Sequence, residues 1–265
     1  MKYSRVRIES FGYELPSHVV TSEDLERRLE PMYETLRIQR GQLEAITGIR
    51  ERRFWDPGFP LHEGATRAGR KAIEAAGIDP GRIGMLIYGA VCRENLEPAT
   101  ACAVAHALAL SPGCQIYDVS NACLGVLNGM VNVANAIELG QIEAGLVVAC
   151  ESAREIVDLT IERLNREKDM DVLRKTVATL TGGSGAVAVL LSDAAASGRG
   201  HRIMGGAARS APEHHRLCVW GPDAGIPGGT AHMAETDAVK VLQNGVALGI
   251  DTFREFRGAL ALPDG

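Results

Sequence analysis

The sequence lacks the features that mark several common classes of protein. It contains no run of five or more like charges, and its 265 residues carry a formal net charge of only −5. Neither nucleic acid nor an anionic membrane surface is therefore indicated as a partner. There is also no glycine-rich nucleotide loop, HExxH pair or CxxC pair, so the sequence gives no support to a nucleotide or metal site.

The sequence also gives no indication of a signal peptide or of a membrane span. Residues 1–7 have no apolar core, and three asparagines and a glutamate interrupt the most apolar region well before the ~20 apolar residues that a span requires. We expect a cytoplasmic protein, in which thiols stay reduced. Apart from Cys123, the cysteines are therefore interpreted as small buried apolar side chains: Cys92, Cys102, Cys114, Cys150 and Cys218.

What the sequence does contain is an alternation of apolar strands and helices. With 46% hydrophobic and 23% charged residues, the chain can form one large domain or two smaller ones. Apolar runs predict strands at 84–88, 115–119, 144–150 and 185–191, and helical spacing predicts helices at 66–76, 98–108 and 123–139. Strands without a polar face that alternate with helices are typical of an α/β fold with a mainly parallel sheet, covered on both sides.

The remaining segments are predicted with fewer signals. A first strand is expected over 4–12, and Thr21 with Asp24 forms a near capping box for a short helix. Residues 155–181 are mostly polar and helical, which indicates an excursion over the surface. A strand at 202–209 and a long helix at 235–262 cannot bury their apolar faces alone. We expect a second layer that is cut short here or completed by another chain.

The clearest chemical signal is the junction between the strand at 115–119 and the helix after it. Cys123 lies at this junction, in the first turn of the helix. Unpaired backbone N–H groups and the positive end of the helix dipole favour the thiolate form there. Cys123 is therefore predicted to be a nucleophile.

Two glycine-containing motifs are near matches to a hydrolase nucleophile elbow, G-x-S-x-G. Around Cys123 only the downstream Gly125 fits, because Asn121 occupies the upstream position. Residues 182–186 read Gly-Gly-Ser-Gly-Ala, with alanine in place of the last glycine. We interpret this second motif as a turn into the following strand rather than as a catalytic site.

Three segments together resemble the thiolase superfamily of condensing enzymes, particularly its β-ketoacyl-acyl-carrier-protein synthase III branch. They are Asp118-Val-Ser-Asn-Ala-Cys-Leu-Gly-Val-Leu-Asn-Gly129, Thr47-Gly-Ile-Arg-Glu-Arg-Arg53 and Gly182-Gly-Ser-Gly-Ala-Val-Ala-Val189. Within the branch, residues 91–100 and 53–55 look most like the acyl-CoA condensing enzymes of bacterial olefin biosynthesis. The resemblance covers essentially the whole chain and implies a homodimeric acyltransferase of lipid metabolism.

The resemblance also implies an architecture. The thiolase fold has five layers in the order αβαβα, made by two similar halves. Residues 1–195 would form the N-terminal half, which carries the nucleophile, and residues 196–265 the start of a C-terminal half that is incomplete in this chain. Cys123 would lie at the N-terminus of a central helix.

Glu97 distinguishes the two chemistries that the branch performs. Synthase III proteins typically have phenylalanine before the corresponding proline, whereas the olefin-pathway enzymes have a glutamate that takes the α-proton of an acyl chain in the partner subunit. Glu97 precedes Pro98 here. Burial in an apolar tunnel would make such a carboxylate a stronger base. On the residues alone, the favoured interpretation of Glu97 is a solvated carboxylate at a helix N-terminus.

Two features depart from the family pattern. Synthase III enzymes place a tryptophan and an arginine before Thr-Gly-Ile to clamp the adenine of coenzyme A, and Gln42 and Ile46 occupy those positions. The family also uses a histidine and an asparagine from its second half, and both are expected beyond Gly265. None of the seven histidines of this sequence lies in the matching context.

Three functions stay open on the sequence. The first is non-decarboxylative Claisen condensation of two acyl-CoA molecules on Cys123, with Glu97 as base. The second is decarboxylative synthase III chemistry with acyl-CoA and malonyl acyl carrier protein, which needs no base. The third is a non-catalytic thiolase-fold subunit that supports an active partner. In the two enzymatic cases acyl-CoA is a substrate, and no cofactor or metal is expected.

Overall fold

The computed structural model of the chain describes every residue except 96, 197–199, 223–231 and 261–265. The chain divides into two compact units, each built from separated segments. Unit 1 comprises Met1–Pro16, Trp55–Ser152 and Gly185–Gly206, and unit 2 comprises Ser17–Phe54, Ala153–Ser184 and Ala207–Gly265. The predicted boundary at residue 195 divides the two similar halves that the family resemblance implies, whereas these two units are defined by contacts within the chain. The boundary therefore stays a prediction.

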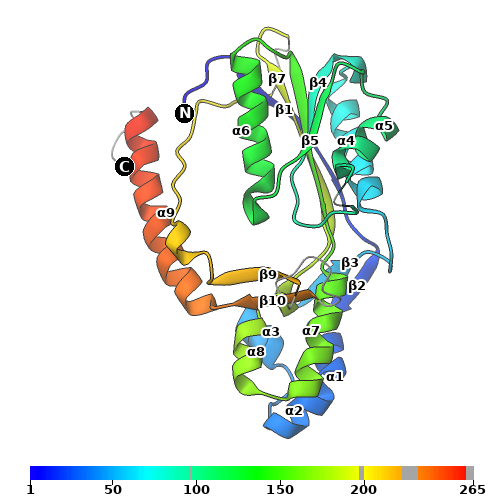
Figure 1. Ribbon diagram of the computed structural model, residues 1–265, viewed down its shortest axis with the longest axis vertical. Helices are drawn as coiled ribbons and strands as arrows, with labels where there is room; N and C mark the ends of the chain where they lie inside the picture. Colours follow the sequence, from blue (N-terminus) through cyan, green and yellow to red (C-terminus); the bar gives the residue numbers. More distant parts are fainter. Residues whose placement is uncertain (96, 197–199, 223–231, 261–265) are drawn as a thin grey trace. The chain divides into compact units, whose positions relative to one another are not determined.

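Unit 1 is organised around a sheet whose described strands have the order β5-β4-β6-β7-β1-β8 (Figure 1). The strands are β1 (Val6–Glu14), β4 (Ile83–Tyr88), β5 (Gln115–Asp118), β6 (Ala144–Glu151), β7 (Gly185–Asp193) and β8 (His201–Arg202). Strands β5, β4 and β6 are parallel, whereas β7, β1 and β8 are antiparallel to their neighbours. The expectation of a mainly parallel sheet was wrong. An apolar run indicates burial on both faces, but it contains no information on the direction of the strand.

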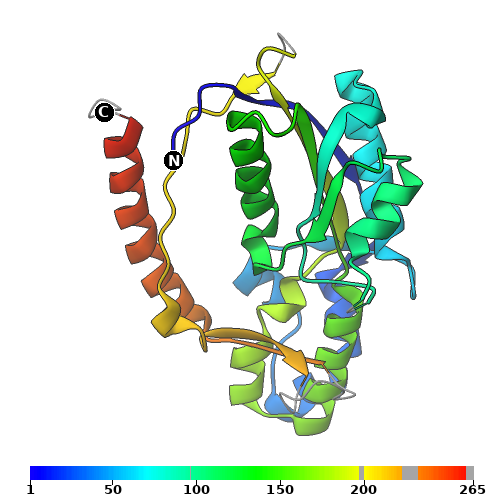
Figure 2. The same ribbon diagram turned by 45° about the horizontal axis from the view of Figure 1, so that its top comes forward.

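Helices cover both faces of this sheet, as predicted. Helices α4 (Leu61–Ala76) and α5 (Thr100–Ala107) lie on one face, and α6 (Gly125–Glu138) lies on the other (Figures 1 and 2). Neighbouring residues of β6 show the alternation: Leu146 packs in the cluster that contains α4 and α5, and Val147 packs with α6. The junction that carries Cys123 is therefore fixed to a sheet with a core on each side.

The burial of α6 differs from the prediction of a helix without a polar face. Gly129, Val133 and Ile137 are buried against the sheet. On the remaining surface Leu127 is 55% exposed, and Asn132 and Asn135 are also exposed. Helix α6 is therefore buried on one side only in the described chain, as an amphipathic helix is.

Two helix starts lie later than the sequence predicted. Helix α5 begins at Thr100 rather than Pro98, because the carboxylate of Asp118 accepts the backbone N–H groups of Thr100 and Ala101, each at 2.9 Å. Helix α6 begins at Gly125, and Cys123 lies in the short 3₁₀ turn η2 (Ala122–Leu124) just before it. Side-chain capping and a tight turn of this kind are not visible in hydrophobic spacing.

The described part of unit 2 combines helices of 6 to 23 residues with two small sheets. Its elements are β2 (His18–Thr21), α1 (Ser22–Arg28), α2 (Glu30–Leu36), α3 (Gln42–Thr47), β3 (Glu51–Phe54), α7 (Arg154–Glu167), α8 (Met170–Thr176), β9 (Cys218–Pro222), β10 (His232–Thr236) and α9 (Ala238–Leu260). The capping box of Thr21 and Asp24 is confirmed at the start of α1. The predicted surface excursion over 155–181 was wrong, because Val157 and Leu164 of α7 are fully buried with Leu29.

The last part of the chain also differs from the prediction. The strand expected over 202–209 is reduced to His201–Arg202, and the long helix starts at Ala238 because residues 232–236 pair with β9. Residues 261–262 of the predicted helix lie outside the described residues. Helix α9 exposes an apolar stripe that includes Leu242, Val246 and Phe253. Among the described residues, no helix is both long and apolar enough to cross a membrane.

Candidate active site

Cys123 lies where the chain turns from the sheet into α6. Strand β5 ends at Asp118, and the N–H of Val119 still donates to the carbonyl oxygen of Tyr88 at 2.8 Å, which ties the turn to β4. Ala122 has a φ of 44°, in the left-handed region that alanine rarely adopts. Such strain is typical of functional turns. The Cys123 side chain is exposed, and it lies in the 3₁₀ turn η2, immediately before α6.

The turn is fixed by a close contact between two glycines. A Cβ atom added to Gly125 would lie 2.7 Å from the carbonyl oxygen of Gly89, the residue that follows β4. Real Cβ atoms do not come this close to an oxygen, so a side chain at either position would separate α6 from the end of β4. Gly125 and Gly89 therefore set the height of Cys123 above the edge of the sheet.

We expect Gly125→Ala to lower the stability of the protein by about 1–3 kcal/mol, because the added methyl group overpacks a site that is closed by backbone atoms. It should also slow the acylation of Cys123. Denaturant titration and intact-mass analysis after incubation with acyl-CoA measure the two effects. Gly245→Ala in α9 is the matched control, since its new Cβ meets no atom within 4 Å. Equal stability of the Gly125→Ala and wild-type proteins would contradict the expectation.

Cys123 lines a cleft of about 490 Å³ in unit 1, which is within the size range of small-molecule sites. The lining residues come from the ends of β1 and β6, the start of β7 and the turn before α6: Tyr13, Leu15, Gly89, Ala122, Cys123, Val126, Ala149, Glu151, Gly185, Ala186 and Val187. Most of them are small or apolar. Among the described residues that line the cleft, Glu151 is the only carboxylate.

The cleft lies at the edge of the sheet where the parallel strands β4, β5 and β6 end. Gly89 follows the last residue of β4, and Glu151 is the last residue of β6. The carboxyl ends of parallel strands are where α/β sheets most often bind ligands. An apolar cleft with an exposed thiol at its wall can accept an acyl chain and bring its thioester carbon to the sulfur.

Glu97 has a different environment. It lies in the segment between β4 and α5, is exposed, and forms no hydrogen bond or ion pair with the described residues. It is not among the residues that line the cleft of Cys123. Within one chain, the structure therefore does not bring the two predicted site residues together. This agrees with the expectation that Glu97 acts in a partner subunit, but does not test it.

The other cysteines divide by environment. Cys114 and Cys150 are buried, as predicted, and burial raises the pKa of Cys114 to about 11 and that of Cys150 to about 12. Cys92 is partly buried. The prediction was wrong for Cys102 and Cys218, which are exposed. Exposure alone therefore does not single out Cys123, but its strained turn and its cleft do.

The two positions at which synthase III enzymes have the adenine-clamping tryptophan and arginine lie on the surface of this chain. Gln42 and Ile46 are exposed residues of α3, and Ile46 is 69% exposed. Neither side chain has the planar cationic or aromatic group that would stack on an adenine. The exposed surface at these two positions therefore lacks the groups that clamp the adenine of coenzyme A in synthase III enzymes.

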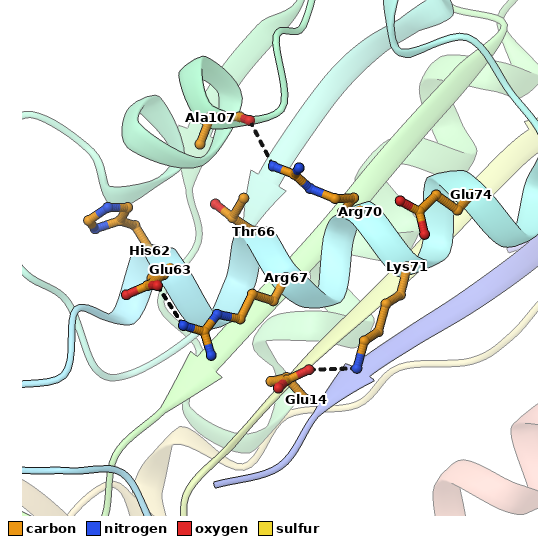
Figure 3. A pocket seen from close by; sticks show the side chains of 9 residues that line it. All are labelled: Glu14, His62, Glu63, Thr66, Arg67, Arg70, Lys71, Glu74 and Ala107. Carbon is orange, nitrogen blue, oxygen red and sulfur yellow. Dashed lines mark hydrogen bonds and ion pairs between the residues drawn. The ribbon is translucent and has the colours of Figure 1, made fainter.

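A second hollow, of about 680 Å³, runs along the outer side of α4 (Figure 3). Its charged side chains are largely satisfied by one another. Arg67 pairs with Glu63 at 2.5 Å, Lys71 pairs with Glu14 at 2.5 Å, and Arg70 donates to the carbonyl oxygen of Ala107 at 3.4 Å. These contacts tie α4 to β1 and to α5. The hollow has cations and carboxylates in similar number, so it offers no net charge to a ligand.

Glu151 is the residue of the cleft that the sequence reasoning missed. Its two carboxylate oxygens accept the backbone N–H groups of Val91 and Cys92, at 2.7 and 3.0 Å. Its own carbonyl oxygen accepts the indole N–H of Trp55 at 3.1 Å. The available signal was a carboxylate at the end of the buried strand 144–150, in the position where α/β sheets bind ligands.

Comparison with known proteins agrees with this geometry. Residues 58–196 match the thiolase N-terminal domain family. The chain is 50% identical over 259 residues to an acyl-CoA:acyl-CoA alkyltransferase of Shewanella oneidensis. The aligned region covers 97% of this chain and 74% of that protein. It is 32% identical over 155 residues to a β-ketoacyl-[acyl-carrier-protein] synthase III of Alkalilimnicola ehrlichii. Here the aligned region covers 58% of this chain and 46% of that protein.

Solved structures of OleA from Xanthomonas campestris match the whole described fold. One of them, with alanine in place of a cysteine, has a TM-score of 0.91 at 33% identity and covers 99% of this chain and 74% of its own. Others have a glutamate replaced by glutamine, aspartate or alanine, or a histidine replaced by asparagine or aspartate. Further structures contain lauric acid and lauroyl-CoA, or cerulenin.

The chain therefore belongs to the thiolase superfamily, in which it is an acyltransferase. Both the resemblance inferred from the sequence motifs and the predicted thiolase fold are confirmed. Within the superfamily, the extent and identity of the match place the chain with the acyl-CoA:acyl-CoA alkyltransferases.

Proposed function

We propose that this acyltransferase joins two acyl-CoA molecules by a Claisen condensation without decarboxylation, with Cys123 as the acyl carrier. The observation that supports it best is the strained strand-to-helix turn, which exposes Cys123 to an apolar cleft, in a chain 50% identical to an acyl-CoA:acyl-CoA alkyltransferase. The substituted glutamate and cysteine of the OleA structures are 26 residues apart, and so are Glu97 and Cys123.

In the first half-reaction the Cys123 thiolate attacks the thioester carbon of an acyl-CoA. The carbonyl π electrons move to oxygen, and the carbonyl re-forms as the bond to coenzyme A breaks. The acyl group is then held on the Cys123 sulfur, and coenzyme A leaves as a thiol after it takes a proton. N–H groups of the first helical turn have no partner within the helix, and that of Cys123 is placed to donate to the transient oxyanion. Covalent storage divides one difficult step into two.

In the second half-reaction a base removes an α-proton from a second acyl-CoA. The resulting carbanion attacks the acyl carbon on Cys123, a carbon–carbon bond forms, and the Cys123 thiolate leaves. Because neither substrate loses carbon dioxide, a base must supply the driving force for carbanion formation. We assign this role to Glu97 of a second subunit in a homodimer, since Glu97 is exposed and lies outside the cleft of its own chain.

The alternative is decarboxylative condensation with malonyl acyl carrier protein, which the 32% identity to a synthase III protein favours. The two chemistries differ in their products. With lauroyl-CoA alone, we expect the protein to release coenzyme A and to form a β-keto thioester that contains both acyl chains in full. Mass spectrometry of the products, with and without malonyl acyl carrier protein, makes the comparison. A product that forms only with malonyl acyl carrier protein, lengthened by two carbons, would replace the proposal by the alternative.

A further inference from the structure

Carboxylates hold the described part of the segment that carries Glu97 to the rest of unit 1 at three points. We call its described residues, 91–95 and 97–99, the Glu97 arm. It begins two residues after Gly89, whose N–H donates to the carbonyl oxygen of Val148 at 2.8 Å and so continues the sheet. It ends at Ala99, and Thr100 is the first residue of α5. At each of the three points, a carboxylate makes the contact.

The first point is at the start of the arm, where Glu151 accepts the N–H groups of Val91 and Cys92 on separate oxygens, at 2.7 and 3.0 Å. Hydrogen bonds from N–H groups to an ionised carboxylate are stronger than those to a neutral acceptor. Glu151 is itself fixed, because it ends a buried strand and its carbonyl oxygen accepts the Trp55 indole N–H. The buried hydroxyl of Tyr88 adds a contact of 2.9 Å to the carbonyl oxygen of Cys92.

The other two points lie in the middle of the arm and just beyond its end. Glu94 accepts the backbone N–H of His62 at 3.1 Å, and its carboxylate lies 2.8 Å from Nδ1 of the same histidine. Asp118 accepts the N–H groups of Thr100 and Ala101. Between Glu94 and Thr100, neither Asn95 nor Glu97 forms a hydrogen bond or an ion pair with a described residue. The arm is therefore anchored on both sides of an exposed Glu97.

We propose that Glu151 is a positioning residue for Glu97: by holding the N–H groups of Val91 and Cys92, it fixes the start of the arm that presents Glu97 to a second subunit. This inference rests on the proposed function of Glu97 as base. It also explains why one carboxylate lines the cleft without being a reactant there. A base that is displaced by about 1 Å can lose ~100-fold in rate, so an arm that delivers a base needs a rigid origin.

The test is Glu151→Gln, with two half-reactions measured separately. Glutamine can accept only one of the two N–H groups with its oxygen, and its NH₂ group then faces the other donor. We expect condensation of two acyl-CoA molecules to slow by about 10- to 100-fold, with the rate of Cys123 acylation within about twofold of wild type. Amide hydrogen exchange at Val91 and Cys92 should become faster.

Glu138→Gln is the matched control. Glu138 also accepts two backbone N–H groups, those of Ser4 and Arg5, each at 3.0 Å, but it does so at the other end of α6. This variant should lose stability as Glu151→Gln does and should keep the wild-type rate of condensation. A second variant, Glu94→Ala, removes the carboxylate that holds the middle of the arm to His62. It should show the same selective loss of condensation.

The outcomes separate this inference from the function on which it rests. If wild type does not condense two acyl-CoA molecules, the proposed function fails, whatever Glu151 does. If wild type condenses them and Glu151→Gln does so at the same rate, the positioning role is wrong. If Glu151→Gln slows acylation as much as condensation, Glu151 acts on the Cys123 thiol rather than on the arm. The inference is supported if Glu151→Gln condenses acyl-CoA more slowly with unchanged acylation and Glu138→Gln keeps the wild-type rate of condensation.

Discussion

Cys123→Ala protein is expected to gain no acyl group when it is incubated with acyl-CoA, whereas wild type gains the mass of one acyl chain. Alanine has no atom that can attack a thioester, and the neighbouring groups of the cleft cannot replace it: the lining is small or apolar apart from Tyr13 and Glu151. Condensation should fall by about 10⁴-fold or more, because removal of a covalent nucleophile eliminates the intermediate and not merely a contact. Intact-mass spectrometry measures the adduct, and released coenzyme A measures turnover.

Cys102→Ala provides the matched control, since Cys102 is also an exposed cysteine of unit 1 but lies on α5. It should keep both the adduct and the turnover. Cys123→Ser tests the chemistry of the atom, because a hydroxyl is a far weaker nucleophile than a thiolate at neutral pH. An adduct of wild-type yield in Cys123→Ala would exclude Cys123 as the acyl carrier and would move the reaction to another group.

The strands and the helices around Cys123 were predictable because their signals are local. Apolar runs such as 144–150 coincide with strands, and the helix that precedes β4 ends at Gly77, which has a φ of 65°. The direction of β7 was not predictable. Its apolar residues 186–191 indicate burial on both faces, but the chain reaches β7 through α7 and α8 of unit 2, and that path decides which way it runs.

The misjudged segment 155–181 has a similar cause. Val157, Ile161 and Leu164 recur at helical spacing, so the helix was evident, but its polar residues indicated a surface location. The buried stripe packs on Leu25 and Leu29, more than a hundred residues earlier in the chain. An apolar stripe on a mostly polar helix shows that a partner exists without showing where the partner is.

The candidate site divides in the same way. Cys123 was predictable as a candidate, because the residues on either side of it identify a strand-to-helix junction. A thiol at such a junction is suited to act as a nucleophile. For Glu151 the sequence shows only a carboxylate at the end of a buried strand. Its hydrogen bonds were not predictable, because they go to backbone N–H groups of residues 59 and 60 positions away, and backbone groups have no sequence signature. Glu97 was identified only through family resemblance, since an exposed carboxylate before a proline is common on protein surfaces.

Glu97→Gln should acylate Cys123 as wild type does and should condense two acyl-CoA molecules about 10²- to 10⁴-fold more slowly, which is the usual contribution of a general base. Glutamine keeps the size of the side chain and its ability to accept a hydrogen bond, but it cannot take a proton. Glu97→Asp keeps the carboxylate on a shorter side chain and should retain an intermediate rate. The measurements are coenzyme A release for both half-reactions and mass spectrometry of the condensed product.

Glu74→Gln controls for the loss of an exposed carboxylate from unit 1, and it should leave both half-reactions unchanged. The assignment also predicts complementation between subunits. Mixed dimers formed from Glu97→Gln and Cys123→Ala chains should regain condensation, because one of their two sites combines an intact Cys123 with an intact Glu97 of the other subunit. If the base acted within its own chain, neither subunit of the mixed dimer would hold both groups, and activity would stay at the level of the separate variants. Recovery of condensation on mixing therefore distinguishes a base delivered by the partner from one that serves its own cleft.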